Sequence, residues 1–324
     1  MRSLSFVGRS AGVFTLAFLV ALGCDGGGGD EDSGVPTGDS GQVMVPDLPA
    51  SAAYREEGEA FEPVSLDWGC LDTGVEPTPG EPVDVTFNLI DFQDDFPVDD
   101  VEVWLFSDNE IANDCSGPMC QMFTTGTDGS AMVTLPANGW YAYRVLPKDG
   151  PTRQQSVFGV FQYNEPAPAS AGPVEGNSVS GKTIDLIPAL LGISREEGTA
   201  TVSGRITDCG GGFVENAVIR LYDPDGNLVE QGDLGDEPSY HFFNGDASNN
   251  LPDQARETSH RDGLYVVVQV PVIDDRPYRV EAYANVDGET RLVGCESARI
   301  FRDAVTILNM TPLRTDAPAS CPAP

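Results

Sequence analysis

The sequence predicts an all-β protein that contains two tandem β-sandwich domains, and three observations lead to this prediction. Short runs in which apolar and polar residues alternate begin near residue 79 and recur almost to the end of the chain, as expected for half-buried strands. The chain of 324 residues contains 36 glycines and 25 prolines, which favours many turns over long helices. The same order of strands and turns occurs twice, and no window of a dozen residues shows the period of about 3.6 residues that a helix requires.

The first copy of this order lies in residues 61–195. It opens with Val83–Ile90, in which apolar and polar residues alternate, and it includes the turn signal Asp128-Gly129. An Asp-Gly pair is favoured between strands because these residues tolerate positive φ angles. The strands expected in this copy are 83–90, 101–106, 131–135, 140–145, 157–163 and 183–187.

The second copy lies in residues 196–315 and follows the same order. Residues 215–222 correspond to residues 99–106 at an offset of 116, whereas the next Asp-Gly turn is offset by 134. The second copy therefore carries about 18 additional residues, which we place in residues 237–261. Its expected strands are 200–207, 215–222, 264–270, 277–283 and 305–310.

Three segments of the second copy carry a resemblance to a known domain. They are Val202–Asp208, Val214–Leu221 and Asp262–Tyr265, which supply a glycine-containing strand, a second strand and an Asp-Gly turn. The first copy keeps Thr127–Gly129 and Leu135–Tyr141 but lacks the glycine of the first strand. This order resembles the carboxypeptidase regulatory-like domain, a transthyretin-like or immunoglobulin-like Greek-key β-sandwich. The resemblance implies a non-catalytic accessory or adhesive module.

Residues 1–23 have the organisation of a signal peptide. Arg2 and Arg9 precede a thirteen-residue uncharged run, which is too short to cross a hydrocarbon core of about 30 Å as a helix. The segment Ala21–Cys24 resembles the lipobox of bacterial lipoproteins. This resemblance implies cleavage before Cys24 and a diacylglycerol on its thiol. The small residues of the segment also fit an ordinary signal peptidase site at the same bond.

Residues 24–60 are expected to form a flexible acidic linker. They are rich in Gly, Asp, Ser and Pro and show no sustained period. About 35 flexible residues have a reach of roughly 30–35 Å, which separates the folded part from a lipid surface. Residues 316–324 are expected to form a C-terminal tail.

Six cysteines remain after Cys24, an even number that predicts disulfides in an exported protein. Cys115 and Cys120 are separated by four residues that include Gly and Pro, so a local bridge between them is geometrically easy. Spacing does not fix the rest of the connectivity. The next pairings that we expect are Cys209 with Cys295 and Cys70 with Cys321. Zinc is the alternative, but strong zinc signatures have two closely spaced pairs and this chain has one.

The formal charge of −33 limits the class of partner. Such a charge repels phosphate backbones, so no nucleic-acid partner is expected. The densest acidic loop lies between two expected strands, and it is the candidate site for calcium. Its candidate ligands are Asp91, Asp94, Asp95, Asp99 and Asp100. We expect no other metal and no cofactor, and we assign no catalytic residue.

Two histidines in the whole chain leave few groups for imidazole catalysis, so we expect a non-enzymatic binding, adhesion or assembly module. The enzyme alternative uses Tyr240, His241 and His260, because intradiol dioxygenases bind iron through tyrosine and histidine on a related sandwich. Those enzymes carry a close His-x-His pair, whereas these histidines are 19 residues apart. Convergence of the three side chains in one pocket would favour this alternative.

Carbohydrate binding is the second alternative, and it would require aromatic rings on the surface. The candidate rings are Trp68, Trp104 and Trp140. An exposed planar pair of these rings would favour it.

Together these observations predict a lipid-anchored protein of the cell envelope, held at the outer membrane by the lipid on Cys24. Asp25 also resembles the inner-membrane retention signal of enterobacterial lipoproteins, so the membrane and its face stay open at this point. The expected partners are the membrane itself and an envelope protein or a glycan.

Overall fold

The computed structural model describes residues 45–321, with gaps at residues 59, 74–77, 109, 112–113, 233–236, 248–249, 274–275, 316 and 318–320. The signal peptide, Cys24 and residues 25–44 lie outside the described residues. Lipid attachment at Cys24 therefore stays a prediction. Among the residues that are described, no helix has both the length and the apolar character that a membrane crossing requires.

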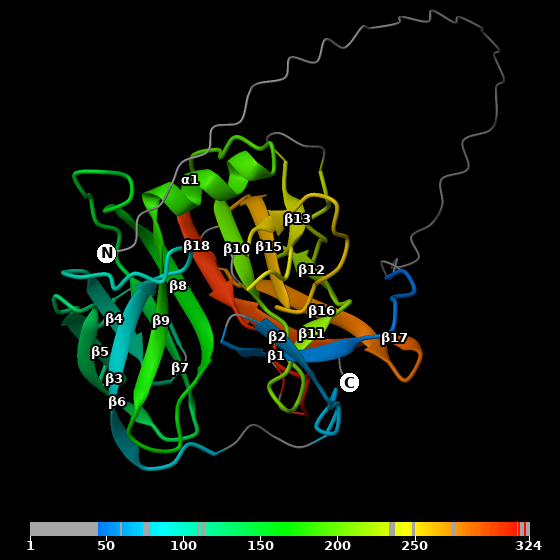
Figure 1. Ribbon diagram of the computed structural model, residues 1–324, viewed down its shortest axis with the longest axis horizontal. Helices are drawn as coiled ribbons and strands as arrows, with labels where there is room; N and C mark the ends of the chain where they lie inside the picture. The colour runs from blue at the N-terminus through cyan, green and yellow to red at the C-terminus, as the bar shows by residue number, and fades with distance from the viewer. Residues whose placement is uncertain are drawn as a thin grey trace, which may run out of the picture. The chain divides into compact units, whose positions relative to one another are not determined.

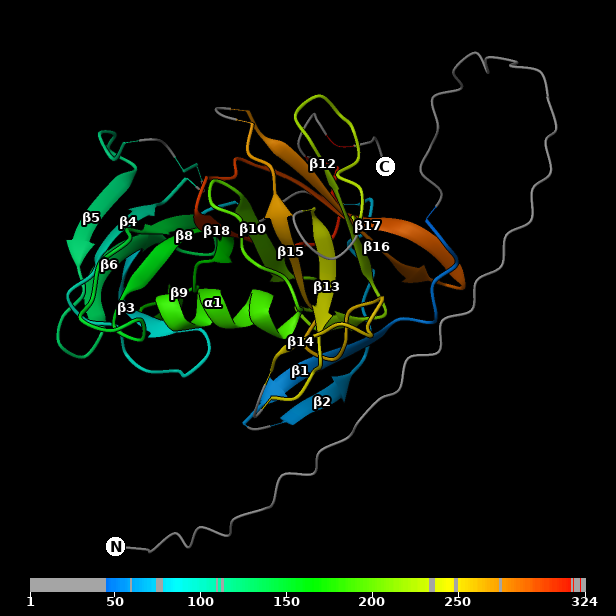
Figure 2. The same ribbon diagram turned by 90° about the horizontal axis from the view of Figure 1, so that it is seen from above.

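Seven strands of the first half pack as two layers around one hydrophobic core. They are β3 (Pro82–Asp91), β4 (Glu102–Phe106), β5 (Cys120–Thr124), β6 (Ser130–Pro136), β7 (Trp140–Val145), β8 (Val157–Pro166) and β9 (Pro173–Ser180). One layer contains β5, β4, β7 and β8, the other contains β6, β3 and β9, and β8 also pairs with β9 (Figure 2). The alternation in β3 explains the packing, because Val85, Phe87 and Leu89 point into this core and are almost fully buried.

The second half is also built from layered strands. They are β10 (Ala200–Arg205), β11 (Phe213–Glu215), β12 (Val218–Tyr222), β13 (Ser239–Phe243), β14 (Pro252–Asp253), β15 (Leu264–Val270), β16 (Tyr278–Val286), β17 (Glu289–Ala298) and β18 (Ala304–Leu308). One sheet has the order β12-β16-β17, and the other contains the path β14-β13-β15-β10-β18. Val202, Tyr265 and Val280 belong to the core of this half. The prediction of an all-β fold built from sandwich layers is confirmed.

The last strand joins the two halves. β18 lies between β10 of the second half and β8 of the first half and pairs with both in parallel (Figure 1). A sheet of 12 strands therefore runs through both halves. Phe161 and Tyr163 on β8 also belong to the core of the second half. The sheet contains strands from both sides of the predicted domain boundary at residues 195–196. The division into two domains there stays a proposal.

Residues 183–187 form part of a helix, so the expectation of a strand there is wrong. The helix α1 (Gly181–Leu190) begins after Ser180, whose Oγ accepts a hydrogen bond from the backbone N–H of Thr183 (3.2 Å). Ile184 of this helix is buried in the core of the first half, and Leu191, the residue that follows its last turn, is buried in a separate cluster.

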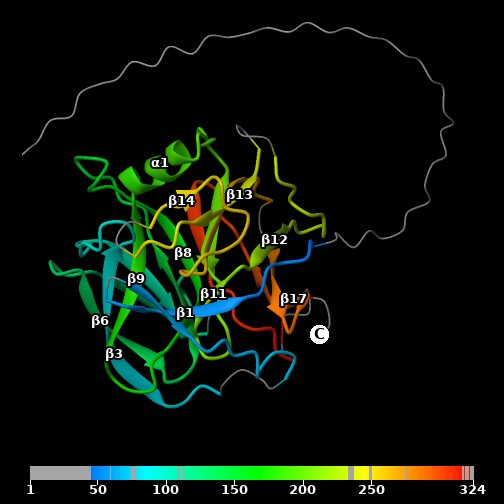
Figure 3. The same ribbon diagram turned by 45° about the vertical axis from the view of Figure 1, so that its right-hand side comes forward.

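The folded part begins earlier than predicted. β1 (Ala52–Glu57) and β2 (Ala60–Val64) form an antiparallel hairpin, and β1 also pairs with β11 (Figure 3). The prediction of a linker up to residue 60 is therefore wrong for β1. Gly58 turns the chain with a φ of +66°, a value that glycine adopts without a steric penalty. Of the six residues of β1 only Ala53 is buried, and Arg55–Glu57 are exposed, so the sequence shows no alternation of apolar and polar residues there.

All six described cysteines are in disulfides, which supports export and leaves none of them to bind zinc. Two of the three predicted pairings, Cys209 with Cys295 and Cys70 with Cys321, are wrong. The bonds in the structure are Cys115–Cys120, Cys70–Cys209 and Cys295–Cys321.

Two backbone contacts explain the pairings that sequence reasoning missed. The hairpin docks on β11, and the Asp67 carbonyl after β2 accepts a hydrogen bond from the backbone N–H of Cys209 (2.9 Å). This contact places Cys70 beside Cys209. The chain after β18 returns along β17, where the backbone N–H of Leu313 donates to the Val293 carbonyl (2.6 Å). The C-terminal segment therefore meets Cys295.

Glu165, at the end of β8, lies where the two halves meet. Its Oε1 accepts a hydrogen bond from the Asn309 side chain (2.9 Å), and the backbone N–H of Arg205 donates to the Oδ1 of the same asparagine (3.2 Å). Burial raises the pKa of Glu165 to about 7, although the Arg205 guanidinium opposes the rise. Glu165 therefore holds a proton in the fold at pH values where the unfolded chain has released it.

We expect Glu165 to make the fold less stable as the pH rises from about 4.5 to about 7, because the native state has the higher proton affinity in this range. Glu165→Gln removes this titration and keeps an oxygen that accepts from Asn309. The free energy of unfolding of the variant minus that of the wild type should be about 1–3 kcal/mol larger at pH 8 than at pH 4.5. Urea denaturation at the two pH values measures the change, with the exposed Glu289→Gln as control. A difference from the wild type that is the same at both pH values would contradict the expectation.

Candidate functional site

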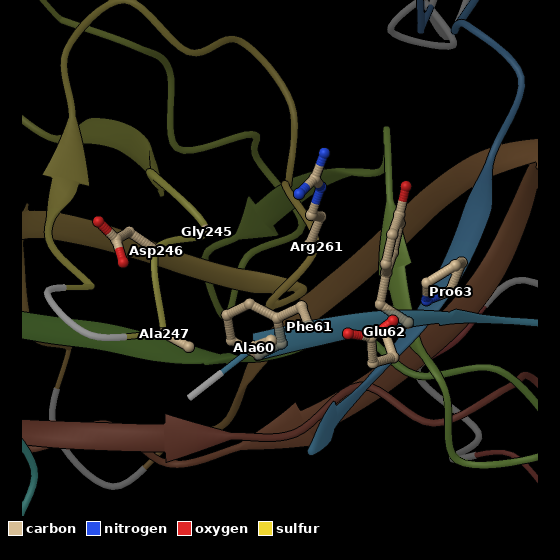
Figure 4. A pocket seen from close by; sticks show the side chains of 9 residues that line it. Ala60, Phe61, Glu62, Pro63, Gly245, Asp246, Ala247 and Arg261 are labelled. Atoms are coloured by element: carbon tan, nitrogen blue, oxygen red, sulfur yellow. The ribbon is translucent and has the colours of Figure 1, made fainter. Parts of the chain in front are cut away.

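A cleft of about 640 Å³ lies between the β1–β2 hairpin and two loops of the second half (Figure 4). Its volume falls within the range of about 300–1,000 Å³ that is typical of small-ligand sites. The cleft is lined by Tyr54, Ala60, Phe61, Glu62, Pro63, Gly245, Asp246, Ala247 and Arg261. One side thus comes from the end of the predicted linker and the first residues of the predicted first domain, and the other comes from the predicted insertion at residues 237–261.

The hairpin is held in place by its apolar residues and by backbone pairing. Phe61 packs edge-on against Phe213 of β11, with 6.2 Å between the ring centroids, and Ala53 is buried. The register of β1 and β11 places Tyr54 opposite Phe213. These contacts fix one wall of the cleft on β11 of the second half.

Tyr54 and Arg261 form the polar centre of the cleft. The guanidinium carbon of Arg261 lies 5.6 Å from the centroid of the Tyr54 ring, which is a cation–π contact. The Tyr54 hydroxyl donates to Oε2 of Glu215 (3.1 Å). Burial, together with the Glu215 carboxylate, raises the pKa of Tyr54, so the hydroxyl stays protonated. The ring is fixed in this way and in turn orients the guanidinium.

His260 supports the loop that carries Arg261. Its Nδ1 accepts a hydrogen bond from the backbone N–H of Arg261 (2.7 Å) and lies 3.5 Å from Oε1 of Glu215. Burial, and then the nearby Arg256, lower the pKa of His260, so the ring is neutral near pH 7 and its Nδ1 can accept. Gly245 faces this ring with a φ of +66°, and a Cβ there would lie 2.5 Å from Nδ1. A glycine is therefore required at this position.

The cleft holds charges of both signs. Arg261 and Asp246 line it from two loops (Figure 4), whereas Glu62 follows Phe61 on β2, so its side chain points to the other face of the hairpin. All three residues are exposed. None of the other residues that line the cleft is charged. This arrangement can bind a ligand through ion pairs and hydrogen bonds. The imidazole beside it already accepts a backbone hydrogen bond.

The three side chains of the enzyme alternative do not form one site. The Tyr240 hydroxyl donates to the Val229 carbonyl (2.5 Å), and its ring packs against the core of the second half. His241 is the next residue on β13 and therefore points to the other face of the sheet, where its Nε2 lies 2.9 Å from Oγ of Ser239. His260 lies next to Arg261 and Gly245 of the cleft but does not line it. The geometry thus contradicts a shared Tyr/His metal site.

The acidic candidates for calcium are engaged in contacts within their own loop and with neighbouring basic residues. Asp91 is 4% exposed and accepts hydrogen bonds from the backbone N–H groups of Gln93, Asp94 and Ser180. Asp94 lies 3.7 Å from the Lys182 ammonium, and Asp100 lies 2.9 Å from that of Lys148. The Asp99 carbonyl faces the same Lys148, and the Asp95 backbone N–H donates to the Asp91 carbonyl. Within the described part of the chain, no three metal-ligating side chains gather.

The three tryptophans are half-buried and belong to different elements. Trp68 lies in the loop after β2, Trp104 lies on β4, and Trp140 begins β7. Trp104 donates to Oε1 of Glu102 (2.6 Å), and the Arg144 guanidinium lies over its ring. The exposed planar pair that would favour carbohydrate binding is not formed by these rings.

No protein family model matches the chain, and no curated protein matches it either. Among solved structures, a shaft pilin of Lactobacillus rhamnosus GG is 14% identical over 72% of this chain and 98% of its own, with a TM-score of 0.22. A minor pilin of Streptococcus agalactiae is 10% identical over 75% of this chain and 100% of its own, with a TM-score of 0.20. An intradiol ring-cleavage dioxygenase of Tetranychus urticae is 17% identical over 35% of this chain and 65% of its own, with a TM-score of 0.17. Because these TM-scores are low, none of the likenesses carries a function over to this chain.

Proposed function

We propose that this chain is a non-enzymatic, lipid-anchored protein of the cell envelope that acts as a binding, adhesion or assembly module. In this proposal the lipid on Cys24 holds the protein at the outer membrane. The residues between Cys24 and Val45 serve as the tether. The cleft around Arg261 is the surface that contacts the partner.

The state of the cysteines is the observation that carries the anchoring part of this proposal. The chain contains seven cysteines, and the six that the structure describes are all paired with one another. No described cysteine is therefore left to pair with Cys24. An exported cysteine next to the expected cleavage bond fits lipid attachment, because the thiol is the group that receives the diacylglycerol. Three disulfides also fit an oxidising compartment outside the cytosol.

The cleft supports the binding part of the proposal. It combines the Arg261 guanidinium, the Asp246 carboxylate and apolar side chains in a volume suited to a ligand. The groups that position Arg261, namely Tyr54, Glu215 and His260, are engaged with one another. This is the arrangement of a binding site, in which supporting contacts hold the recognition group in place.

Intact-mass measurement of protein extracted from membranes with detergent tests the anchoring. We expect a mass that lacks residues 1–23 and is increased by a diacylglycerol, with no thiol that reacts before reduction. Cys24→Ala is the control, because it keeps the six disulfide-bonded cysteines, and it should leave the membrane fraction. A mature chain that begins at Cys24 and carries no added lipid would contradict the proposal.

A further inference from the structure

We propose that the free edge of β5 is a second binding surface, on which an extended segment of a partner protein pairs as an added strand. The segment carries an apolar side chain flanked by lysine or arginine. The edge belongs to the first half, whereas the cleft around Arg261 is built from the β1–β2 hairpin and loops of the second half. The inference therefore goes beyond the proposed role of the cleft and does not depend on it.

β5 is the last strand of its sheet, so one side of its backbone has no partner strand. It pairs with β4 at the end of the 12-stranded path (Figure 2). In this ladder the backbone N–H of Thr125 donates to the Val101 carbonyl (3.0 Å). Because the pattern of an antiparallel ladder alternates, the N–H and C=O groups of Met122 and Thr124 point away from β4. No residue that the structure describes forms a hydrogen bond with these four groups.

The edge of β6 shows how such a strand is closed. β6 pairs with β3, and the outward backbone N–H and C=O groups of Thr134 are both bonded to the side-chain amide of Gln121 (3.0 and 2.6 Å). The amide thus takes the place of a neighbouring strand at this position. No described side chain does the same for Met122 and Thr124, so β5 is the edge that is open to strand addition.

The side chains beside this edge favour an apolar residue in the added strand. Met122 is 60% exposed and lies opposite Trp104 in the register of β4 and β5. The Arg144 guanidinium lies 4.9 Å from the centroid of the Trp104 ring on its other side, on β7. This row of side chains crosses the outer face of the layer and ends at Met122. A leucine opposite Met122 would extend the row and cover the exposed methionine.

The charge near the edge favours lysine or arginine beside that apolar residue. Residues 101–143 contain five carboxylates and no lysine or arginine. Among them, Glu102 is exposed, lies opposite Thr124, and takes part in none of the ion pairs of the described residues. A second copy of this chain is disfavoured as the occupant, because each copy carries a formal charge of −33 and would be repelled.

Fluorescence anisotropy with the fluorescein-labelled peptide Lys-Thr-Leu-Thr-Lys amide, on the detergent-extracted full-length protein, tests the inference. Thr124→Pro removes an outward N–H but no bond to β4, and proline is tolerated at such edge positions. It should weaken binding about fivefold or more, as expected for a lost hydrogen bond. Met132→Pro is the matched control, because the Met132 N–H points away from β3 in the same way on β6, and it should leave the affinity unchanged.

The charged part of the inference has its own variants. Glu102→Gln should weaken binding about threefold, as expected for an exposed ion pair, whereas the exposed Glu289→Gln should not. The difference between these two variants should shrink as the salt concentration rises. Replacing both lysines of the peptide by aspartate should remove measurable binding.

Methylation of the backbone nitrogens of the peptide keeps its side chains and removes its donors, so it should weaken binding to the wild type. This measurement keeps the inference testable if a proline variant does not fold, which circular dichroism detects. Equal affinity of the Thr124→Pro and Met132→Pro proteins would overturn the inference, and so would equal affinity for the lysine and aspartate peptides. A wild-type dimer that Thr124→Pro separates into monomers would assign the edge to a second copy and would also overturn it.

Discussion

Replacing both Cys70 and Cys209 by serine is expected to lower the free energy of unfolding by about 3–5 kcal/mol. The bond joins residues that are 139 positions apart. The entropy that such a bond removes from the unfolded chain grows with the length of the loop that it closes. The bond also fastens the segment after β2, and with it the hairpin that forms one wall of the cleft.

Urea denaturation without reductant measures the loss, and removal of the Cys115–Cys120 bond is the matched control. That bond joins residues only five positions apart, so its replacement by two serines should cost about 2 kcal/mol by the same reasoning. Equal losses in the two double variants would contradict the dependence on loop length.

The variant without the Cys70–Cys209 bond is still expected to fold, because Asp208 also holds the segment after β2 against the loop that contains Cys209. Its side chain is 3% exposed and accepts hydrogen bonds from the backbone N–H groups of Asp67, Gly210 and Gly212 at 2.7–3.0 Å. A carboxylate that accepts several backbone hydrogen bonds is held strongly in place. The loops therefore stay docked, and the unfolding transition remains measurable.

Most strands could be predicted from the sequence because each layer buries one side of its strands. The period of two residues is visible within a single strand and does not depend on its partner. In β3 the buried residues Val85, Phe87 and Leu89 carry this signal. The helix α1 was missed because it has ten residues and its buried positions include Thr183 and Ile184, whose β-branched side chains favour strands over helices.

The cleft could not be predicted because it depends on pairings between distant segments. Tyr54 and Arg261 meet across more than 200 positions of sequence. β1 has six residues, and of these Ala53 alone is fully buried, so its pattern does not stand out. His260 could be named from the sequence because the chain has only two histidines. The role of its neighbour Arg261 could not, because it depends on the contact with the ring of Tyr54. The same dependence on distant contacts explains why two disulfide pairings were wrong.

Gly204→Ala is expected to lower the free energy of unfolding by about 2–4 kcal/mol, which is more than most single substitutions cost. Gly204 lies on β10, and a Cβ there would be 2.0 Å from the Leu308 carbonyl oxygen and 2.8 Å from the Tyr265 hydroxyl. That hydroxyl donates to the same carbonyl at 2.6 Å, so neither atom can move away without losing the bond. An added methyl group must therefore separate β10 from β18, the strand that also pairs with β8 of the first half.

Thermal and urea denaturation measure this loss, with Gly172→Ala as control because a Cβ at Gly172 would have no neighbour within 4 Å. Hydrogen exchange distinguishes a local effect of the clash from an effect that reaches the first half. If β18 joins the halves, Gly204→Ala should speed the exchange of amides on β8, which does not itself contact the substituted residue. A free energy of unfolding within about 0.5 kcal/mol of that of the control, or faster exchange confined to β10 and β15, would contradict this expectation. The effect of the substitution would then not reach the first half. The two halves would then unfold as independent units, and the shared sheet would not couple them.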